Sequence, residues 1–200
     1  MKSNQINDYI IFLEILNKKL ETYFDSQKEY IHCKEGCSLC CREGEYPCSE
    51  LEYEFLRIGF SLLPLITQQK IINNVIEIKN ERKNFKGETF VYKCPFLIED
   101  RCSIYNYRMI ICRTFGLSYY IEDENGDKRI KNPFCIEKGL NYSEVFDTQR
   151  KIISDELYKE KGFKNEPVAF NLSLKFLLNR LGHDGMDLDF GEEKALIDWL

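Results

Sequence analysis

Histidine is almost missing from this sequence, in which His32 and His183 are the only two among 200 residues. Hydrolytic metal sites usually take two or three imidazole ligands per metal ion, so a histidine-rich site of that kind is not expected. The glycines form neither a P-loop nor the fingerprint of a dinucleotide-binding turn. These absences argue against zinc hydrolases and leave no recognisable nucleotide-binding motif.

Long apolar runs and an excess of basic charge are also missing. The most apolar window, residues 55–66, is too short to span a bilayer and contains Arg57 and Pro64. The N-terminal segment has no small-residue cleavage site of a signal peptide. The 28 basic and 33 acidic residues give a net charge of -5, and no basic stripe emerges. We therefore expect a cytoplasmic protein with no membrane and no nucleic-acid partner, while an unknown protein partner or protein substrate stays open.

Cysteine, in contrast, is abundant, with nine residues. Disulfides do not persist in a reducing cytosol, whereas thiolate metal sites do. The odd number and the adjacent pair Cys40-Cys41 also fit a disulfide framework poorly. We interpret the cysteines as ligands of a metal ion or cluster, with disulfides and scattered free thiols as the alternatives.

Eight of the cysteines fall into two groups, and Cys48 stands apart with no assigned role. The first group lies in CKEGCSLCC and comprises Cys33, Cys37, Cys40 and Cys41. The second is spread over a β-prone region and comprises Cys94, Cys102, Cys112 and Cys135. Thiolates suit both zinc and iron–sulfur clusters. The eight could therefore supply one site with spare thiols or two four-thiolate sites.

A four-thiolate shell around zinc or a cubane cluster carries a net charge of about −2. Such a charge requires N–H donors and cations nearby. Six basic residues flank the cysteines: Lys34, Arg42, Lys93, Arg101, Arg108 and Arg113. Each is a candidate partner of the metal centre. The alternative is that it lies on an ordinary solvated face.

Apolar spacing predicts helices on both sides of the second cysteine group. Gaps of three and four residues predict an amphipathic helix over 6–30. Ser49 and Glu52 have the form of a capping box, which predicts a helix over 50–62. Pro64 suits the first turn of another helix, running to about Phe85. Further helical patterns occupy 143–161 and 166–181, the latter closed by Gly182.

The centre of the chain changes character. Residues 89–92 are β-prone, and residues 117–132 have the pattern of a hairpin with Asn125-Gly126 as its turn. We predict a mainly α fold with a small irregular β-containing, cysteine-rich core, in the α+β class. A single domain, 1–200, would hold this core at 33–135 between helical flanks at 1–32 and 136–200.

The segment after Gly182 is acidic, which predicts a solvated terminus. Its only tryptophan, Trp199, is expected to anchor an amphipathic segment there. His183 is expected to be solvated.

One spacing in the first group is misleading. Cys33-x3-Cys37-x2-Cys40 matches the arrangement by which radical SAM enzymes hold a cluster with one open iron. Those enzymes embed it in a barrel of alternating strands and helices, whereas here long helical patterns flank the motif. Cys41 also supplies a fourth thiolate at once. We therefore do not favour radical chemistry.

The order of the cysteine motifs carries a resemblance to a known family. CKEGCSLCC is followed about fifty residues later by KCPFL and then by DRCSIYNYRMIICRTFG. This order resembles the YkgJ-like cysteine-cluster family, which is described as a zinc- or iron-chelating domain. The resemblance covers 33–135, and Cys135 fits the last cysteine of the family. Leu39 replaces a usual glycine and Met109 a usual proline, but every thiol stays in place.

The resemblance implies roles for other residues of the matched motif. Arg113 would hydrogen-bond a cluster sulfur or a ligand thiolate as a cofactor-binding residue, and Tyr105 would do the same or pack in the core. The family includes flagellin lysine N-methylases, which are thought to carry an iron–sulfur cluster and to use S-adenosylmethionine. It thus implies methyl transfer as one activity, and whether this chain is an enzyme stays open. His32, beside Cys33, is either a ligand or an ordinary helix-end residue.

The preferred occupant is an iron–sulfur cluster of the four-iron type. Dense cysteines, few histidines and the Cys94-Pro95 pair favour it, because Cys-Pro occurs in cluster-binding runs. Zinc is the alternative. A cluster would assist a transfer reaction such as protein-lysine methylation, whereas zinc would make the chain a non-enzymatic, zinc-stabilised binding module.

Overall fold

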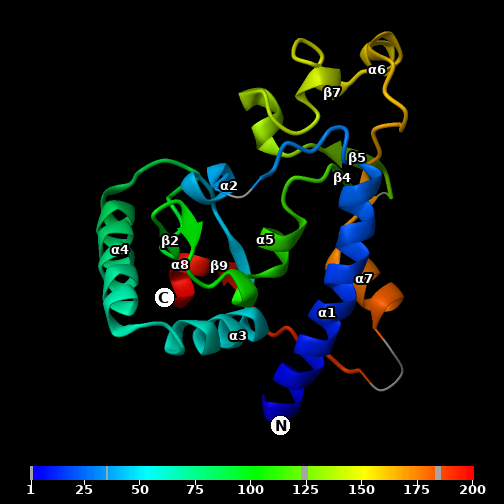
Figure 1. Cartoon of the computed structure of the whole chain (residues 1–200). Coiled ribbons are helices and arrows are strands. Elements are labelled where there is room, and N and C mark those ends of the chain that lie inside the picture. Colours follow the sequence, from blue (N-terminus) through cyan, green and yellow to red (C-terminus); the bar gives the residue numbers. More distant parts are fainter. Residues whose placement is uncertain (1, 35, 123–125, 183–185) are drawn as a thin grey trace. The chain divides into compact units, whose positions relative to one another are not determined.

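The computed structural model describes residues 2–34, 36–122, 126–182 and 186–200. Helices dominate, and all sheets are small, so the expected mainly α fold with a minor β component is confirmed (Figure 1). The helices are α1 (Lys2–Ser26), α2 (Leu39–Arg42), α3 (Glu50–Ser61), α4 (Leu65–Asn84), α5 (Ile110–Thr114), α6 (Asp155–Lys161), α7 (Leu174–Leu181) and α8 (Leu196–Trp199), with short 3-10 turns η1 (Tyr105–Tyr107), η2 (Phe134–Lys138) and η3 (Ser143–Val145). Within the described residues, no helix is both long and apolar enough to cross a bilayer.

The strands are two to four residues long. They are β1 (Pro47–Ser49), β2 (Leu97–Ile98), β3 (Arg101–Cys102), β4 (Tyr119–Glu122), β5 (Lys128–Lys131), β6 (Phe146–Asp147), β7 (Ile152–Ile153), β8 (Phe170–Asn171) and β9 (Glu193–Ala195). The pairs β1–β9, β2–β3 and β6–β7 are antiparallel, and a three-stranded sheet has the order β5-β4-β8. Sheets this small cannot form a core by themselves, so the helices and loops provide most of the buried surface.

The chain forms two compact units. The first unit comprises residues 1–9, 36–113 and 187–200, and the second comprises 10–35 and 114–186. Each unit gathers segments that are distant in sequence, so neither is a continuous stretch of the chain.

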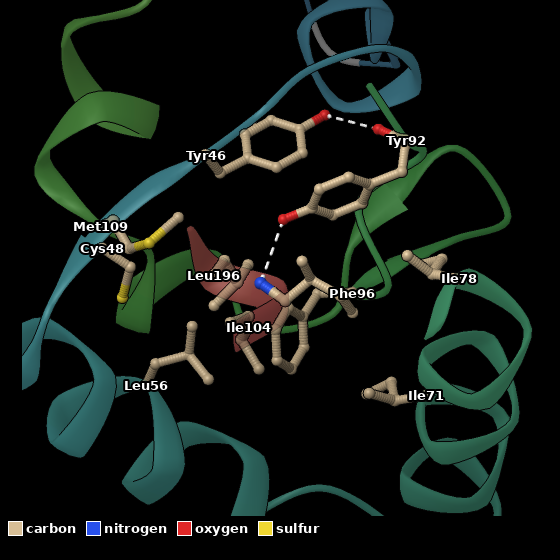
Figure 2. Packing of buried hydrophobic residues seen from close by; sticks show 11 residues of the cluster. Tyr46, Cys48, Leu56, Ile71, Ile78, Tyr92, Phe96, Ile104, Met109 and Leu196 are labelled. Carbon is tan, nitrogen blue, oxygen red and sulfur yellow. Dashed lines mark hydrogen bonds between the residues drawn. The ribbon is translucent and has the colours of Figure 1, made fainter. Parts of the chain in front are cut away.

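The first unit is built around a core to which the C-terminal segment contributes. Leu196 and Ile197 are buried in it with Tyr92, whose hydroxyl accepts a hydrogen bond from the Ile197 backbone N–H at 3.2 Å (Figure 2). The Trp199 indole N–H donates to the carbonyl oxygen of Cys48 at 2.8 Å, which confirms its expected anchoring role. The expected solvated terminus is therefore wrong for 193–200, because apolar burial there outweighs the acidic composition.

A complete capping box begins α3. The Ser49 hydroxyl accepts from the Glu52 backbone N–H, and the Glu52 carboxylate accepts from the Ser49 N–H at 3.0 Å, as the sequence predicted. The other Glu52 oxygen accepts from the Ile110 backbone N–H at 2.9 Å, at the start of α5. A buried carboxylate with three donors is stable where it lies, and it fixes α5 against the N-terminus of α3.

Close packing against α3 requires a glycine. A Cβ atom on Gly59 would lie 2.4 Å from Cγ of Tyr107, which is on η1. The ring of Tyr107 also contacts that of Phe55, with centroids 5.0 Å apart. The turn that follows β3 is therefore held directly against the surface of α3.

The second unit contains most of α1 and a separate aromatic core. Tyr30 and Tyr142 are buried and stacked, with ring centroids 5.6 Å apart, among Ile136, Val145 and Phe146. The expected hairpin is confirmed as β4 and β5, with Tyr120 opposite Ile130. Gly126 has the positive φ of a turn residue, whereas Asn125 and His183 lie outside the described residues.

Two helix predictions in this unit are wrong over part of their length. Within 143–161, Asp147 accepts hydrogen bonds from the N–H groups of Gln149 and Arg150, and Lys151 has φ 58°. These features make the turn between β6 and β7, so a helix begins only after the N-cap Ser154. An Asp side chain that binds nearby backbone N–H groups competes with helix formation in this way.

The helix expected over 166–181 exists only as α7. Backbone N–H groups of Lys164 and Asn165 donate to Glu29, and that of Val168 donates to Gln27, so this segment is extended along the end of α1. Ser173 then caps α7. Gly182 ends the helix as predicted, though its φ is −61°; a Cβ there would lie 2.5 Å from the Leu178 carbonyl oxygen.

The remaining β-prone stretch, 89–92, forms no strand. Its only ladder contact among the described residues is a single antiparallel bridge between Tyr92 and Gly44. The Tyr92 side chain belongs to the core of the first unit, which explains its aromatic character without a sheet.

The contribution of the C-terminal segment can be measured with Leu196→Ala. Leu196 is 0% exposed, so the substitution removes buried methyl groups and leaves a cavity. We expect a loss of about 2–5 kcal/mol in the free energy of unfolding, measured by urea denaturation. Leu65→Ala is the matched control, because Leu65 is 81% exposed; an equally small effect of both variants would contradict the packed tail.

The carboxylate that joins α3 to α5 gives a second prediction. Glu52→Gln puts an amide donor where the carboxylate accepts from Ser49 and Ile110. We expect a loss of about 1–3 kcal/mol in unfolding free energy, because a buried donor loses its acceptor. Glu54→Gln, on the same helix but paired only with Arg57 among the contacts described, should change stability far less.

Candidate metal centre

All nine cysteines are free thiols. The first unit contains six of the eight predicted ligands, namely Cys37, Cys40, Cys41, Cys94, Cys102 and Cys112, together with Cys48. The second unit contains Cys33 and Cys135. The structure therefore brings members of both sequence groups into one compact unit.

The first two thiols lie on α2. This single helical turn places the sulfur atoms of Cys40 and Cys41 4.0 Å apart. The Cys41 N–H donates to the Ser38 carbonyl oxygen at 2.8 Å, and the Cys41 carbonyl oxygen accepts from the Cys94 N–H, also at 2.8 Å. The double-cysteine motif and the Cys-Pro motif are thus joined by a backbone hydrogen bond.

Cys102 lies on a hairpin directly after the Cys-Pro motif. Its strand β3 pairs with β2, so that Cys102 is opposite Leu97. Glu99 and Asp100 connect the strands with φ values of 50° and 60°, as a type I′ turn requires. Asp100 also binds Arg42 at 2.6 Å, which links this turn to the end of α2.

Cys112 lies on α5, whose first N–H group binds Glu52 as described above. Its own N–H donates to the Met109 carbonyl oxygen at 3.2 Å, and Met109 is buried in the core of the first unit. The position of this thiol therefore depends on the core and on the capping box of α3.

The electrostatics of the thiols show that they are neighbours. Burial raises the pKa of Cys94, and the nearby thiols of Cys112, Cys102 and Cys40 raise it further. Burial raises the pKa of Cys112 to about 12, with Cys102 and Cys40 adding to the effect. The hydrogen bond with Cys41 is the main cause of the raised pKa of Cys40. We call Cys40, Cys41, Cys94, Cys102 and Cys112 the five-thiol group.

Tyr46 lies beside this group and was missed in the sequence. Its hydroxyl donates to the carbonyl oxygen of Cys40 at 3.2 Å, and it also lies 3.4 Å from that of Tyr92 (Figure 2). Burial raises its pKa, and the thiols of Cys94, Cys41 and Cys112 add to the effect. No sequence signal singled it out, because it is one of twelve tyrosines.

The two residues predicted to contact a cofactor, Tyr105 and Arg113, both contact Arg108. The Arg108 guanidinium lies 3.8 Å from the ring centroid of Tyr105. Arg113 is buried, and its Nε donates to the carbonyl oxygen of Arg108 at 3.1 Å while Nη2 donates to that of Asn106 at 2.7 Å. Burial lowers the pKa of Arg113, and the charge of Arg108 lowers it further.

The five-thiol group is not a closed shell of ligands. Within the described ranges, no three or more His, Cys, Asp or Glu side chains are arranged so that they could hold a metal ion. Cys37 is exposed, two residues before α2, and Cys48 is buried in the core, where its sulfur lies 3.5 Å from the Ser49 carbonyl oxygen.

In the second unit, Cys33 is bound by Asn141, which is fully buried. The Asn141 amide donates to the sulfur of Cys33 at 3.2 Å and to the Gly116 carbonyl oxygen at 2.9 Å, and its oxygen accepts from the His32 N–H. A Cβ on Gly116 would lie 2.8 Å from the Asn141 nitrogen, so a glycine is required there. Cys135 is buried in η2.

The His32 side chain is exposed, and its Nε2 lies 3.3 Å from the carboxylate of Glu144, which belongs to the same unit. Asn141, like Tyr46, was missed, because a single amide far from the cysteines in sequence gives no motif.

No family model matches the sequence, and neither the curated proteins nor the solved structures compared with it include a significant match.

The exposures of the thiols predict the order in which they react. Alkylation of the reduced, metal-free protein, followed by peptide mass spectrometry, should label Cys33 and Cys37 before Cys48 and Cys135, because buried thiols react only after local opening. All nine should react alike in denaturant. Rapid labelling of Cys48 in the native protein would contradict its burial.

Proposed function

We propose that this protein binds a thiolate-ligated metal centre in its first unit, through the five-thiol group. The preferred occupant is an iron–sulfur cluster of the four-iron type, which takes four of these thiolates. The observation that supports the proposal is the proximity of five thiols from separate segments of the chain. Cys33, Cys37 and Cys135 are further candidates, proposed from the sequence motif.

The donor chemistry of the group fits such a centre. Its side chains are all thiols, the ligands that select iron–sulfur clusters and zinc over hard cations such as magnesium. The group also lies near a buried polar atom that lacks an acceptor in the described part of the chain, the Nε of Arg108. A site that gains negative charge on binding would supply that acceptor.

Binding must draw the thiols closer together, because they do not form a shell as they stand. The segments that carry them are short: α2 has one turn, β2 and β3 have two residues each, and Cys94 precedes β2 in a loop. Such segments make few hydrogen bonds of their own and can adjust at little energetic cost. Ligation and completion of the fold would then be coupled, as in other thiolate metal sites.

The occupant determines which class of function follows. A bound cluster supplies electron transfer, or a Lewis acid where one iron has an exchangeable position. The resemblance to the YkgJ-like family supports the finer proposal that the cluster assists a transfer reaction such as protein-lysine methylation with S-adenosylmethionine. A closed four-thiolate zinc site would instead stabilise a non-enzymatic binding module.

The decisive experiment is anaerobic purification followed by iron, sulfide and zinc analysis and an absorbance spectrum. A brown protein with broad absorption near about 400 nm and stoichiometric iron and sulfide supports the cluster. A colourless protein with tightly bound zinc supports the binding module and contradicts the cluster. Absence of both metals after reconstitution would contradict the proposal.

Single substitutions test the ligand set. Cys102→Ser and Cys112→Ser should each lower metal content and melting temperature together, because ligation and folding are coupled. The control is Cys48→Ala, because Cys48 is fully buried in the core and is not among the proposed ligands. It should lower stability while metal content per folded molecule stays the same. Full metal content in Cys112→Ser would remove that residue from the set.

A further inference from the structure

The basic residues that flank the cysteines differ in what they contact. Arg42 forms an ion pair with Asp100 at 2.6 Å, and Lys93, which directly precedes Cys94, is exposed. Arg113 donates to two backbone carbonyl oxygens. Arg108 is different, because its Nε is buried and has no hydrogen-bond partner in the described part of the chain.

The surroundings of Arg108 are rich in thiols and poor in acceptors. Its charge lowers the pKa of Cys40, Cys102 and Cys112, against the effect of burial, so the guanidinium lies within electrostatic range of all three. Among the described residues, no carboxylate forms an ion pair with it. A buried N–H without an acceptor is costly, and the structure retains this one beside the five-thiol group.

Two neighbours hold the Arg108 side chain and backbone in place. The ring of Tyr105 stacks on the guanidinium at 3.8 Å, a favourable cation–π contact. The side chain of Arg113 binds the Arg108 carbonyl oxygen and that of Asn106, which fixes the backbone within η1 and directly after it. Gly59 lets η1 approach α3 closely. The position of the guanidinium is therefore set before anything binds.

We propose that Arg108 supplies the counter-charge of the metal centre. Its guanidinium hydrogen-bonds a ligand sulfur and offsets the negative charge of the bound thiolates. The inference rests on the proposed function and adds a residue that positions and tunes the centre. Tyr105 and Arg113 then act through Arg108, by holding its guanidinium and its backbone.

Charge balance gives the physical reason. Four thiolates around either a four-iron cluster or zinc leave a net charge of about −2 in a partly buried place. An N–H···S hydrogen bond from a fixed cation stabilises that charge, and loss of such an outer partner typically weakens metal binding by about 10–100-fold. In a cluster, the reduced form carries one more negative charge, so the same cation also favours reduction.

The test compares Arg108→Gln, Arg108→Lys and the control Lys93→Gln in the full chain. Metal affinity is measured by competition with a chelator, and for an iron–sulfur protein the midpoint potential is measured by redox titration. We expect Arg108→Gln to bind metal at least about tenfold more weakly and to have a more negative potential. Arg108→Lys should recover part of both, and Lys93→Gln should match the wild type.

Unchanged affinity and potential in folded Arg108→Gln would overturn the inference while leaving the proposed function intact. A wild-type protein that binds neither iron nor zinc would overturn both. Should Arg108→Gln fail to fold by circular dichroism, Tyr105→Leu decides, because Tyr105 is 58% exposed and its loss only releases the guanidinium. Weaker metal binding by Tyr105→Leu, with a loss smaller than that expected for Arg108→Gln, supports the inference. An unchanged metal affinity in Tyr105→Leu overturns it.

Discussion

The Glu52 carboxylate is the constraint on which the first unit depends. One of its oxygens completes the capping box of α3 with Ser49, and the other accepts from Ile110 at the start of α5. Ser49 also ends β1, which pairs with β9 and so with the C-terminal segment. A single buried acceptor therefore ties together α3, the C-terminal segment and the helix that carries Cys112. A carboxylate in this position is retained because every donor around it is a group that would otherwise lack a partner.

The burial of the thiols and the nearby Arg108 guanidinium have opposite effects on the charge of the five-thiol group. Burial disfavours the thiolate forms of three of these cysteines, because it raises the pKa of Cys94, Cys102 and Cys112. A neutral group of thiols costs little to bury, whereas a group of thiolates would repel one another. The charge of Arg108 acts against that tendency, because it lowers the pKa of Cys40, Cys102 and Cys112. Buried thiols beside a cation are electrostatically suited to a centre that removes protons from thiols as it binds.

The proposed site also explains why the sequence carries more cysteines than one centre requires. Cys48 packs in the core like a small apolar residue, and Cys135 is buried in a turn of the second unit. Cys33 is bound by a buried amide, and Cys37 is exposed. The thiols thus lie in distinct environments, and their number alone would not reveal which of them are close enough to share a metal.

Local sequence signals determined much of the fold. Ser49 and Glu52 defined the start of α3, Pro64 preceded α4, and apolar spacing located α1, because caps, proline and periodicity act within a few residues. The same signals failed at 143–161, where Asp147 made a turn, and at 166–173, where Gln27 bound the backbone of Glu166 and Val168. Motif order identified the cysteines as a set and marked Tyr105 and Arg113. Only the tertiary structure decided that the tail is buried, that five thiols are neighbours, and that the buried Nε of Arg108 lacks an acceptor among the residues described. Each of these depends on segments far apart in the chain, and contacts of that kind are fixed by packing and charge, which leave no regular pattern in the sequence.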